Sequence, residues 1–177
     1  MWMRCVVSLG SILVLGFAGA SADHQPLECM AFSVGHELTL PGTPVEIYDK
    51  LTGDLSPWWD HTFSPSPRRF FIDPQPGGGF YEIFDETGDG VEHATVIWAE
   101  RGVRLRFEGP LGFSGRAVTM VHTYDLAAVG KDSTRLSLAV RASGEAIDGA
   151  AEAVDAVWRH FLFDRFKPYV EAGRVRD

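Results

Sequence analysis

Two polar side chains, Glu82 and His122, are the residues of this sequence best placed to do chemistry. Side chains alternate between the two faces of a β-strand, so Glu82 shares an apolar face with Phe80, and His122 shares one with Met120. A carboxylate facing an apolar hollow has a raised pKa unless it is paired, and a histidine there can exchange a proton or orient a polar ligand group. Together they suggest an acid and a base for a cyclisation, isomerisation or hydrolysis.

Each of these residues also has a purely structural interpretation. Glu82 could be paired for stability alone, with Arg165 near the apolar face of the last helix as its partner, and His122 could be an ordinary core histidine. Tyr124 offers a hydroxyl group to a ligand, but a core tyrosine with a hydrated tip has the same pattern. His93 falls on the opposite face of its strand, which predicts that its side chain is exposed.

Three tryptophans, Trp58, Trp59 and Trp98, are expected at the mouth of the hollow, where they could stack on a flat or hydrophobic ligand. Ordinary packing in the core and loops is the alternative. Asp60 and His61 follow the tryptophan pair, at the same rim or in a solvated loop. The predicted ligand-binding residues are Trp58, Trp59, Phe80, Glu82, Phe84, Val96, Trp98, Phe107, Met120, His122, Tyr124, Trp158 and Phe161.

The sequence predicts neither a metal site nor a cofactor. Acidic residues adjacent to histidines, such as Glu92 and His93, point to opposite faces of a strand and cannot ligate one ion together. His36 has Leu40, not a second histidine, four residues later. The glycine run 77–79 lacks the following Lys-Ser or Lys-Thr of a phosphate loop, and no serine lies in a Gly-x-Ser-x-Gly elbow.

The elements that must position these residues are a sheet and a long helix. From Ala150 onward, apolar residues recur at intervals of three and four, which predicts an amphipathic helix over 149–172 with an aromatic inner face. Thr43, Pro44 and Glu46 predict the capped start of a short helix. Alternating segments predict strands at 32–40, 68–72, 80–85, 91–100, 103–108, 116–127 and 133–143. This order indicates an α+β fold and excludes a doubly wound parallel sheet.

The N-terminal residues have the pattern of an export signal. A positive start, an apolar run to Phe17 and small residues up to Ala22 predict a signal peptide over 1–22, cleaved near Ala22, and therefore a periplasmic or secreted protein without a stable membrane anchor. We expect a flexible segment over 23–31, a single domain over 32–172 and a tail over 173–177. The net charge of -8 argues against a nucleic-acid partner. Composition favours no oligomeric state.

Residues 32–172 carry a series of short motifs that resemble one known superfamily. The motifs are Pro44-Val45, Trp58-Trp59, Pro76-Gly77-Gly78 before Phe80 and Glu82, Val96, Gly109-Pro110-Leu111-Gly112, Thr134-Arg135-Leu136 with a later Gly144, and Trp158 with Phe166-Lys167. In this order they resemble the SRPBCC or START-like helix-grip superfamily, and most of all the branch named after the activator of the heat-shock protein 90 ATPase. The resemblance implies a curved antiparallel sheet of about seven strands wrapped on the C-terminal helix, with a ligand-sized cavity between them.

The resemblance implies no single activity, because relatives bind lipids, hormones or polyketides, assist chaperones, or catalyse reactions. The leading hypothesis is an exported, non-enzymatic protein that holds a hydrophobic or aromatic molecule between sheet and helix. The alternative is an enzyme that uses Glu82 and His122 as acid and base in the same cavity. A third hypothesis, a co-chaperone-like interaction domain, predicts an exposed apolar patch and is disfavoured by export.

Overall fold

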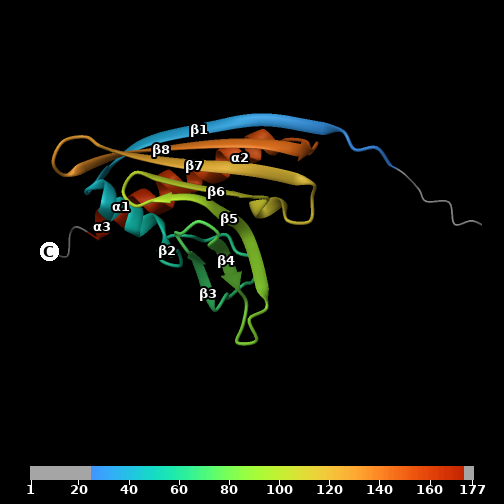
Figure 1. The fold of residues 1–177 in the computed structure, drawn as a ribbon, viewed down its shortest axis with the longest axis horizontal. Helices are drawn as coiled ribbons and strands as arrows, with labels where there is room; N and C mark the ends of the chain where they lie inside the picture. The colour runs from blue at the N-terminus through green and yellow to red at the C-terminus, as the bar shows by residue number, and fades with distance from the viewer. Residues whose placement is uncertain (1–24, 174–177) are drawn as a thin grey trace, which may run out of the picture.

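A curved antiparallel sheet of eight strands wraps around a long C-terminal helix in the computed structural model, which describes residues 25–173 (Figure 1). The strand order is β1-β8-β7-β6-β5-β4-β3-β2. The predicted signal peptide lies outside the described residues, as does nearly all of the predicted tail. No helix within the described part of the chain has the length and apolarity needed to cross a membrane.

The elements follow the predicted order with shifted ends. They are β1 (Cys29–Pro41), α1 (Pro44–Leu51), β2 (Gly53–Asp54), β3 (Arg69–Ile72), β4 (Gly79–Ile83), β5 (Gly90–Glu100), β6 (Arg104–Gly109), a 3₁₀ turn (Leu111–Phe113), β7 (Val118–Ala128), β8 (Ser133–Glu145), α2 (Ala150–Arg159), a π-helical segment (His160–Phe166) and α3 (Lys167–Ala172). The sheet has eight strands instead of about seven because β2 is an additional strand of two residues.

Hydrogen-bonded contacts define where the first strand and the first helix begin. The prediction that 23–31 is flexible is wrong for its last residues, because β1 begins at Cys29, which pairs with Glu145 of β8. The predicted start of α1 is confirmed. The Thr43 side chain accepts a hydrogen bond from the Glu46 backbone N–H, the Glu46 carboxylate accepts one from the Thr43 N–H, and Pro44 occupies the first turn.

The C-terminal helix runs without a break from Ala150 to Ala172, but it is not α-helical throughout. Between α2 and α3 the turns widen, and the Lys167 N–H donates to the Leu162 carbonyl five residues back. The inner face remains buried along the whole length, with exposures of 4% or less, at Val154, Trp158, Phe161, Leu162, Phe166 and Val170. This face packs on the concave side of the sheet and forms one continuous core with it.

Two β-bulges in β5 change which side chains face the core. His93 is the first extra residue, because Phe80 pairs with Ala94 while Tyr81 pairs with Glu92. A bulge places one additional side chain on the face opposite to the one that strict alternation predicts. His93 is therefore only 7% exposed, and the prediction that it faces solvent is wrong.

The second bulge turns Trp98 away from the core. Val96 pairs with Phe107 and Trp98 pairs with Arg106, which leaves Ile97 as the extra residue. Trp98 is 44% exposed, and the guanidinium groups of Arg104 and Arg106 lie 5.7 and 5.8 Å from the centre of its ring. The prediction that Trp98 lines the cavity is wrong for this reason.

Gly109 provides a test of the first bulge, because a β-carbon at this position would collide with the His93 carbonyl oxygen and the backbone of Ala94. We expect Gly109→Ala to lower the free energy of unfolding by about 1–3 kcal/mol, the usual cost of overpacking. Gly112→Ala in the neighbouring turn is the matched control, because no atom lies within 4 Å of its added β-carbon. Denaturant unfolding would contradict the steric account if both variants lost the same stability.

Candidate functional site

A pocket of about 380 Å³ lies between the C-terminal helix and the strongly curved half of the sheet. Its volume falls within the range of roughly 300–1,000 Å³ typical of small-molecule sites. The lining is mainly aromatic and aliphatic, and its polar side chains include His61, Thr62 and His93. The lining residues are Trp59, His61, Thr62, Phe63, Phe70, Phe80, His93, Leu111, Gly112, Phe113, Met120, Ala153, Val154, Val157, Trp158 and Phe161.

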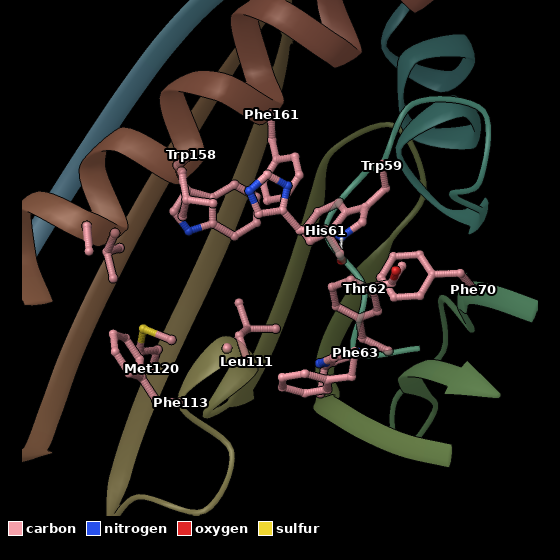
Figure 2. Close-up of a pocket in the computed structure, with 16 residues that line it drawn as sticks. Trp59, His61, Thr62, Phe63, Phe70, Leu111, Phe113, Met120, Trp158 and Phe161 are labelled. Atoms are coloured by element: carbon pink, nitrogen blue, oxygen red, sulfur yellow. Dashed lines mark hydrogen bonds between the residues drawn. The ribbon is translucent and has the colours of Figure 1, made fainter. Parts of the chain in front are cut away.

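The helix and the loop between β2 and β3 together form one wall of the pocket. Figure 2 shows Trp158 and Phe161 projecting from the helix toward the side chains of the loop. The ring of Trp59 stacks on Phe161, with centroids 3.7 Å apart and planes at 19°. The indole N–H of Trp59 donates to the His61 carbonyl oxygen over 2.6 Å. The stacked pair therefore joins the loop to the helix and fixes the direction of the loop at the rim.

The structure places the predicted ligand-binding residues in three groups. Five of them line the pocket, namely Trp59, Phe80, Met120, Trp158 and Phe161. Six are buried outside its lining, namely Trp58, Glu82, Val96, Phe107, His122 and Tyr124. The other two are Trp98, on the outer face, and Phe84, which follows the last residue of β4 and is partly exposed.

Glu82 is fully buried, and its partners are not the one that the sequence suggested. Its Oε2 accepts from the Phe63 N–H at 3.0 Å and lies 3.1 Å from His93 Nε2, while Oε1 accepts from the Ser64 N–H at 2.6 Å. Arg165 contacts other groups, donating to the Trp58 carbonyl oxygen at 3.2 Å. Glu82 therefore fastens the pocket loop to β4 and β5.

The environment of His93 keeps the imidazole of this pair neutral near neutral pH. Burial lowers the pKa of His93, and the Glu82 carboxylate opposes this only in part. A neutral imidazole can donate its Nε2–H to Glu82, and His93 also contributes to the pocket lining. Glu82 and His93 are thus a satisfied buried pair at the pocket wall, which accounts for the burial of both residues.

His122 lies in an aromatic stack and does not contact Glu82. Its ring stacks on Phe107 with centroids 4.9 Å apart, and Trp158 lies 5.1 Å from it on the helix side. Neither ring nitrogen has a hydrogen-bond partner, and complete burial lowers the pKa of His122 to about 3. Burial likewise raises the pKa of Tyr124. Both side chains are uncharged at neutral pH and belong to the core behind the pocket.

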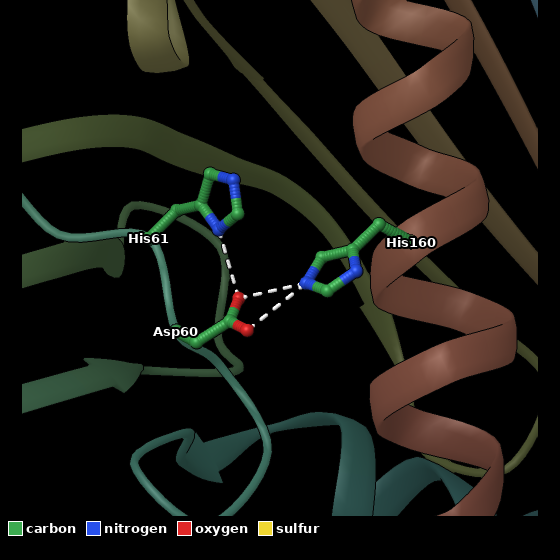
Figure 3. Close-up of side chains that lie close together, drawn as sticks. All are labelled: Asp60, His61 and His160. Carbon is green, nitrogen blue, oxygen red and sulfur yellow. Dashed lines mark hydrogen bonds and ion pairs between the residues drawn. The ribbon is translucent and has the colours of Figure 1, made fainter.

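The side chains of Asp60, His61 and His160 lie close together (Figure 3), and His61 also lines the pocket, which places the cluster at the pocket rim. Asp60 Oδ1 lies 2.8 Å from His61 Nδ1 and 3.0 Å from His160 Nε2. Partial burial raises the pKa of Asp60, but hydrogen bonds from both histidines and the charge of Arg165 outweigh it, so this pKa lies below its usual value. The sequence left Asp60 and His61 either at the rim or in a solvated loop, and His160 was missed because only acidic residues adjacent to histidines were considered.

No family model matches the sequence, and a search of curated proteins finds no match either. Solved structures do match. They include protein SA2116 from Staphylococcus aureus (TM-score 0.60, 12% identity, covering 84% of this chain and 99% of that one). Mll3558 from Rhizobium loti matches with a TM-score of 0.57 and 20% identity, covering 76% and 94% of the two chains. CalU16 from Micromonospora echinospora matches with a TM-score of 0.56 and 15% identity, covering 86% of this chain and 90% of that one.

At such low identities these likenesses show the fold alone. They support the predicted α+β architecture of the helix-grip type, in which a curved antiparallel sheet holds one long C-terminal helix. The chain shares this architecture with the three proteins over most of their lengths.

Proposed function

We propose that the protein binds a small hydrophobic or aromatic molecule in the pocket between the sheet and the C-terminal helix. The observation that carries the proposal is the pocket itself, about 380 Å³ in volume and lined mainly by aromatic and aliphatic side chains. In this proposal the chain is an exported SRPBCC or START-like protein, as the N-terminal pattern and the order of the motifs suggest.

The arrangement of the lining suggests the shape of the ligand. Trp158 and Phe161 on the helix lie opposite Leu111, Phe113 and Met120, and the space between them suits an apolar body (Figure 2). Rings of this kind favour aromatic partners, which gain about 0.5–1.5 kcal/mol per ring pair beyond simple burial. The polar lining is contributed largely by imidazole and hydroxyl groups, so we propose a ligand with a flat apolar body and one polar end.

The acid–base alternative has less support from the geometry. Glu82 already accepts from two backbone N–H groups and pairs with His93, and neither Glu82 nor His122 belongs to the pocket lining. A general acid or base must come within hydrogen-bond reach of the reacting group. The binding function therefore remains our conclusion.

The proposal can be tested by matched substitutions on one helix. Ala153 lines the pocket and Ala156 is exposed outside it, one turn further along α2. The probe is anilinonaphthalene sulfonate, an apolar fluorophore with one anionic end. We expect Ala153→Trp, which fills the pocket mouth, to weaken probe binding at least tenfold, and Ala156→Trp to leave it unchanged.

Native mass spectrometry of the protein purified from its own compartment complements this titration, because a bound molecule would appear as a discrete mass increase. We expect that increase in the unmodified protein and in Ala156→Trp, but not in Ala153→Trp. Equal probe affinity in the two variants, or no saturable binding to the unmodified protein, would contradict the proposed function.

A further inference from the structure

We propose that Asp60, His61 and His160 bind a divalent first-row transition ion, Zn²⁺ or an ion of similar preference, at the rim of the pocket. Each residue offers one ligand atom, and the three atoms lie within 4.8 Å of one another. Two imidazole nitrogens and one carboxylate oxygen form a donor set that suits Zn²⁺ and Fe²⁺, whereas Ca²⁺ and Mg²⁺ require mainly oxygen ligands.

Two of the distances between the donor atoms are close to the spacing around one small ion. Zn²⁺ binds nitrogen and carboxylate oxygen at about 2.0–2.2 Å, so tetrahedral donors lie about 3.3 Å apart. Asp60 Oδ1 is 2.8 Å from His61 Nδ1 and 3.0 Å from His160 Nε2. Lengthening these two distances by a few tenths of an ångström would reach the tetrahedral spacing, and the two imidazole nitrogens lie within 4.8 Å of each other.

Contacts outside the cluster hold the loop and the helix at this spacing. Trp59 precedes Asp60, Phe161 follows His160, and these two rings are the stacked pair that joins the loop to the helix. His160 is also the first residue of the π-helical segment, a type of widened turn that is frequent at functional sites. The donor atoms are thus brought together by packing that does not depend on them.

Two further side chains orient the proposed ligands. Asp164 Oδ2 lies 3.5 Å from His160 Nδ1, the nitrogen on the far side of the ring from Asp60. Arg165 Nε lies 3.3 Å from Asp60 Oδ2. Metal-binding histidines usually donate their second N–H to a carboxylate, and metal-binding carboxylates are themselves hydrogen-bonded. Asp164 and Arg165 occupy the positions of these two supports and contact the proposed ligands as ion-pair partners.

His61 connects the proposed metal site to the pocket, because it belongs to both. Three protein donors leave a coordination position open for water or a ligand. The pocket's occupant would then carry a metal-coordinating end, such as a carboxylate. This last step rests on the proposed function, whereas the metal site itself does not.

Isothermal titration of the untagged protein with Zn²⁺ tests the site. We expect one ion per chain in the unmodified protein, affinity reduced at least tenfold in both His61→Ala and His160→Ala, and a loss of about tenfold in Asp164→Asn. His36→Ala is the matched control, because His36 lies outside the cluster, pairs with Asp155, and should leave affinity unchanged. Circular dichroism confirms that each variant is folded.

The alternative is a hydrogen-bonded cluster that only joins the loop to the helix. That interpretation predicts no saturable Zn²⁺ binding, or equal affinity in His61→Ala, His160→Ala and the unmodified protein, and either result would overturn the metal site. Binding of anilinonaphthalene sulfonate is measured separately in the presence of a chelator. Failure of the metal site and failure of the pocket are therefore distinguishable.

Discussion

Glu82→Gln is expected to lower the free energy of unfolding by about 3 kcal/mol, although it barely changes the size of the side chain. The carboxylate accepts the N–H groups of Phe63 and Ser64 and pairs with His93. An amide has one acceptor oxygen, so its NH₂ group must face one of these donors. A buried donor left without an acceptor costs about 1–3 kcal/mol, and the charge of the acceptor is lost as well.

The control for this prediction is Glu86→Gln, because Glu86 is a highly exposed residue that forms a surface ion pair with Arg68. Such pairs contribute little, so we expect a change within about 0.5 kcal/mol. Hydrogen exchange should also accelerate at the amides of Phe63 and Ser64 in the Glu82 variant. Equal denaturation midpoints for the two variants would show that the buried carboxylate does not hold the loop.

His122→Phe is expected to make the protein more resistant to acid. The folded-state pKa of His122 is about 3, lowered by burial, whereas an unfolded histidine titrates near 6.5. Below pH 6.5 the unfolded state therefore binds a proton that the folded state does not, and stability falls with decreasing pH until about pH 3. The full loss in the free energy of unfolding is about 4–5 kcal/mol, and the phenylalanine variant does not undergo this loss because its side chain does not titrate.

The surroundings of His122 also favour this substitution at neutral pH. Phe107 and Trp158 flank the ring, and both ring nitrogens lack hydrogen-bond partners, so phenylalanine keeps the stacking and removes two unsatisfied polar atoms. Urea unfolding at a series of pH values checks the prediction. The stability difference between the variant and the unmodified protein should grow by about 3 kcal/mol between pH 7 and pH 4. A constant difference would mean that His122 does not titrate as its burial requires.

Most of the fold could be predicted from the sequence because its long elements have regular periods. The alternation in β7 and β8 and the apolar spacing in the last helix correctly indicated a sheet packed on a helix. The assumption of regular alternation was also the source of the wrong predictions for His93 and Trp98. A single extra residue in β5 reverses all later side chains, and bulges at His93 and Ile97 did so twice.

The candidate site was less predictable because its contacts join distant parts of the chain. Asp60 and His160 are 100 residues apart, and tertiary contacts such as the stack of Trp59 on Phe161 bring their elements together. The partners of Glu82 are two backbone N–H groups, which have no signature in side-chain types. By contrast, Phe80 and Trp158 were correctly expected to face the hollow, because they lie in regular stretches.

The widened turns of the last helix keep its inner face in phase with the sheet. Val154, Trp158, Leu162, Phe166 and Val170 follow one another at intervals of four, and all are buried. In an unbroken α-helix each such step overshoots a full turn by about 40°, so four steps would carry Val170 to the side opposite Val154. A π turn rotates less per residue and cancels this drift. α-Helical winding through 160–166 at the same length would turn Val170 away from the core, whereas deleting one residue there would remove the wide turn and leave the downstream inner face close to its present direction.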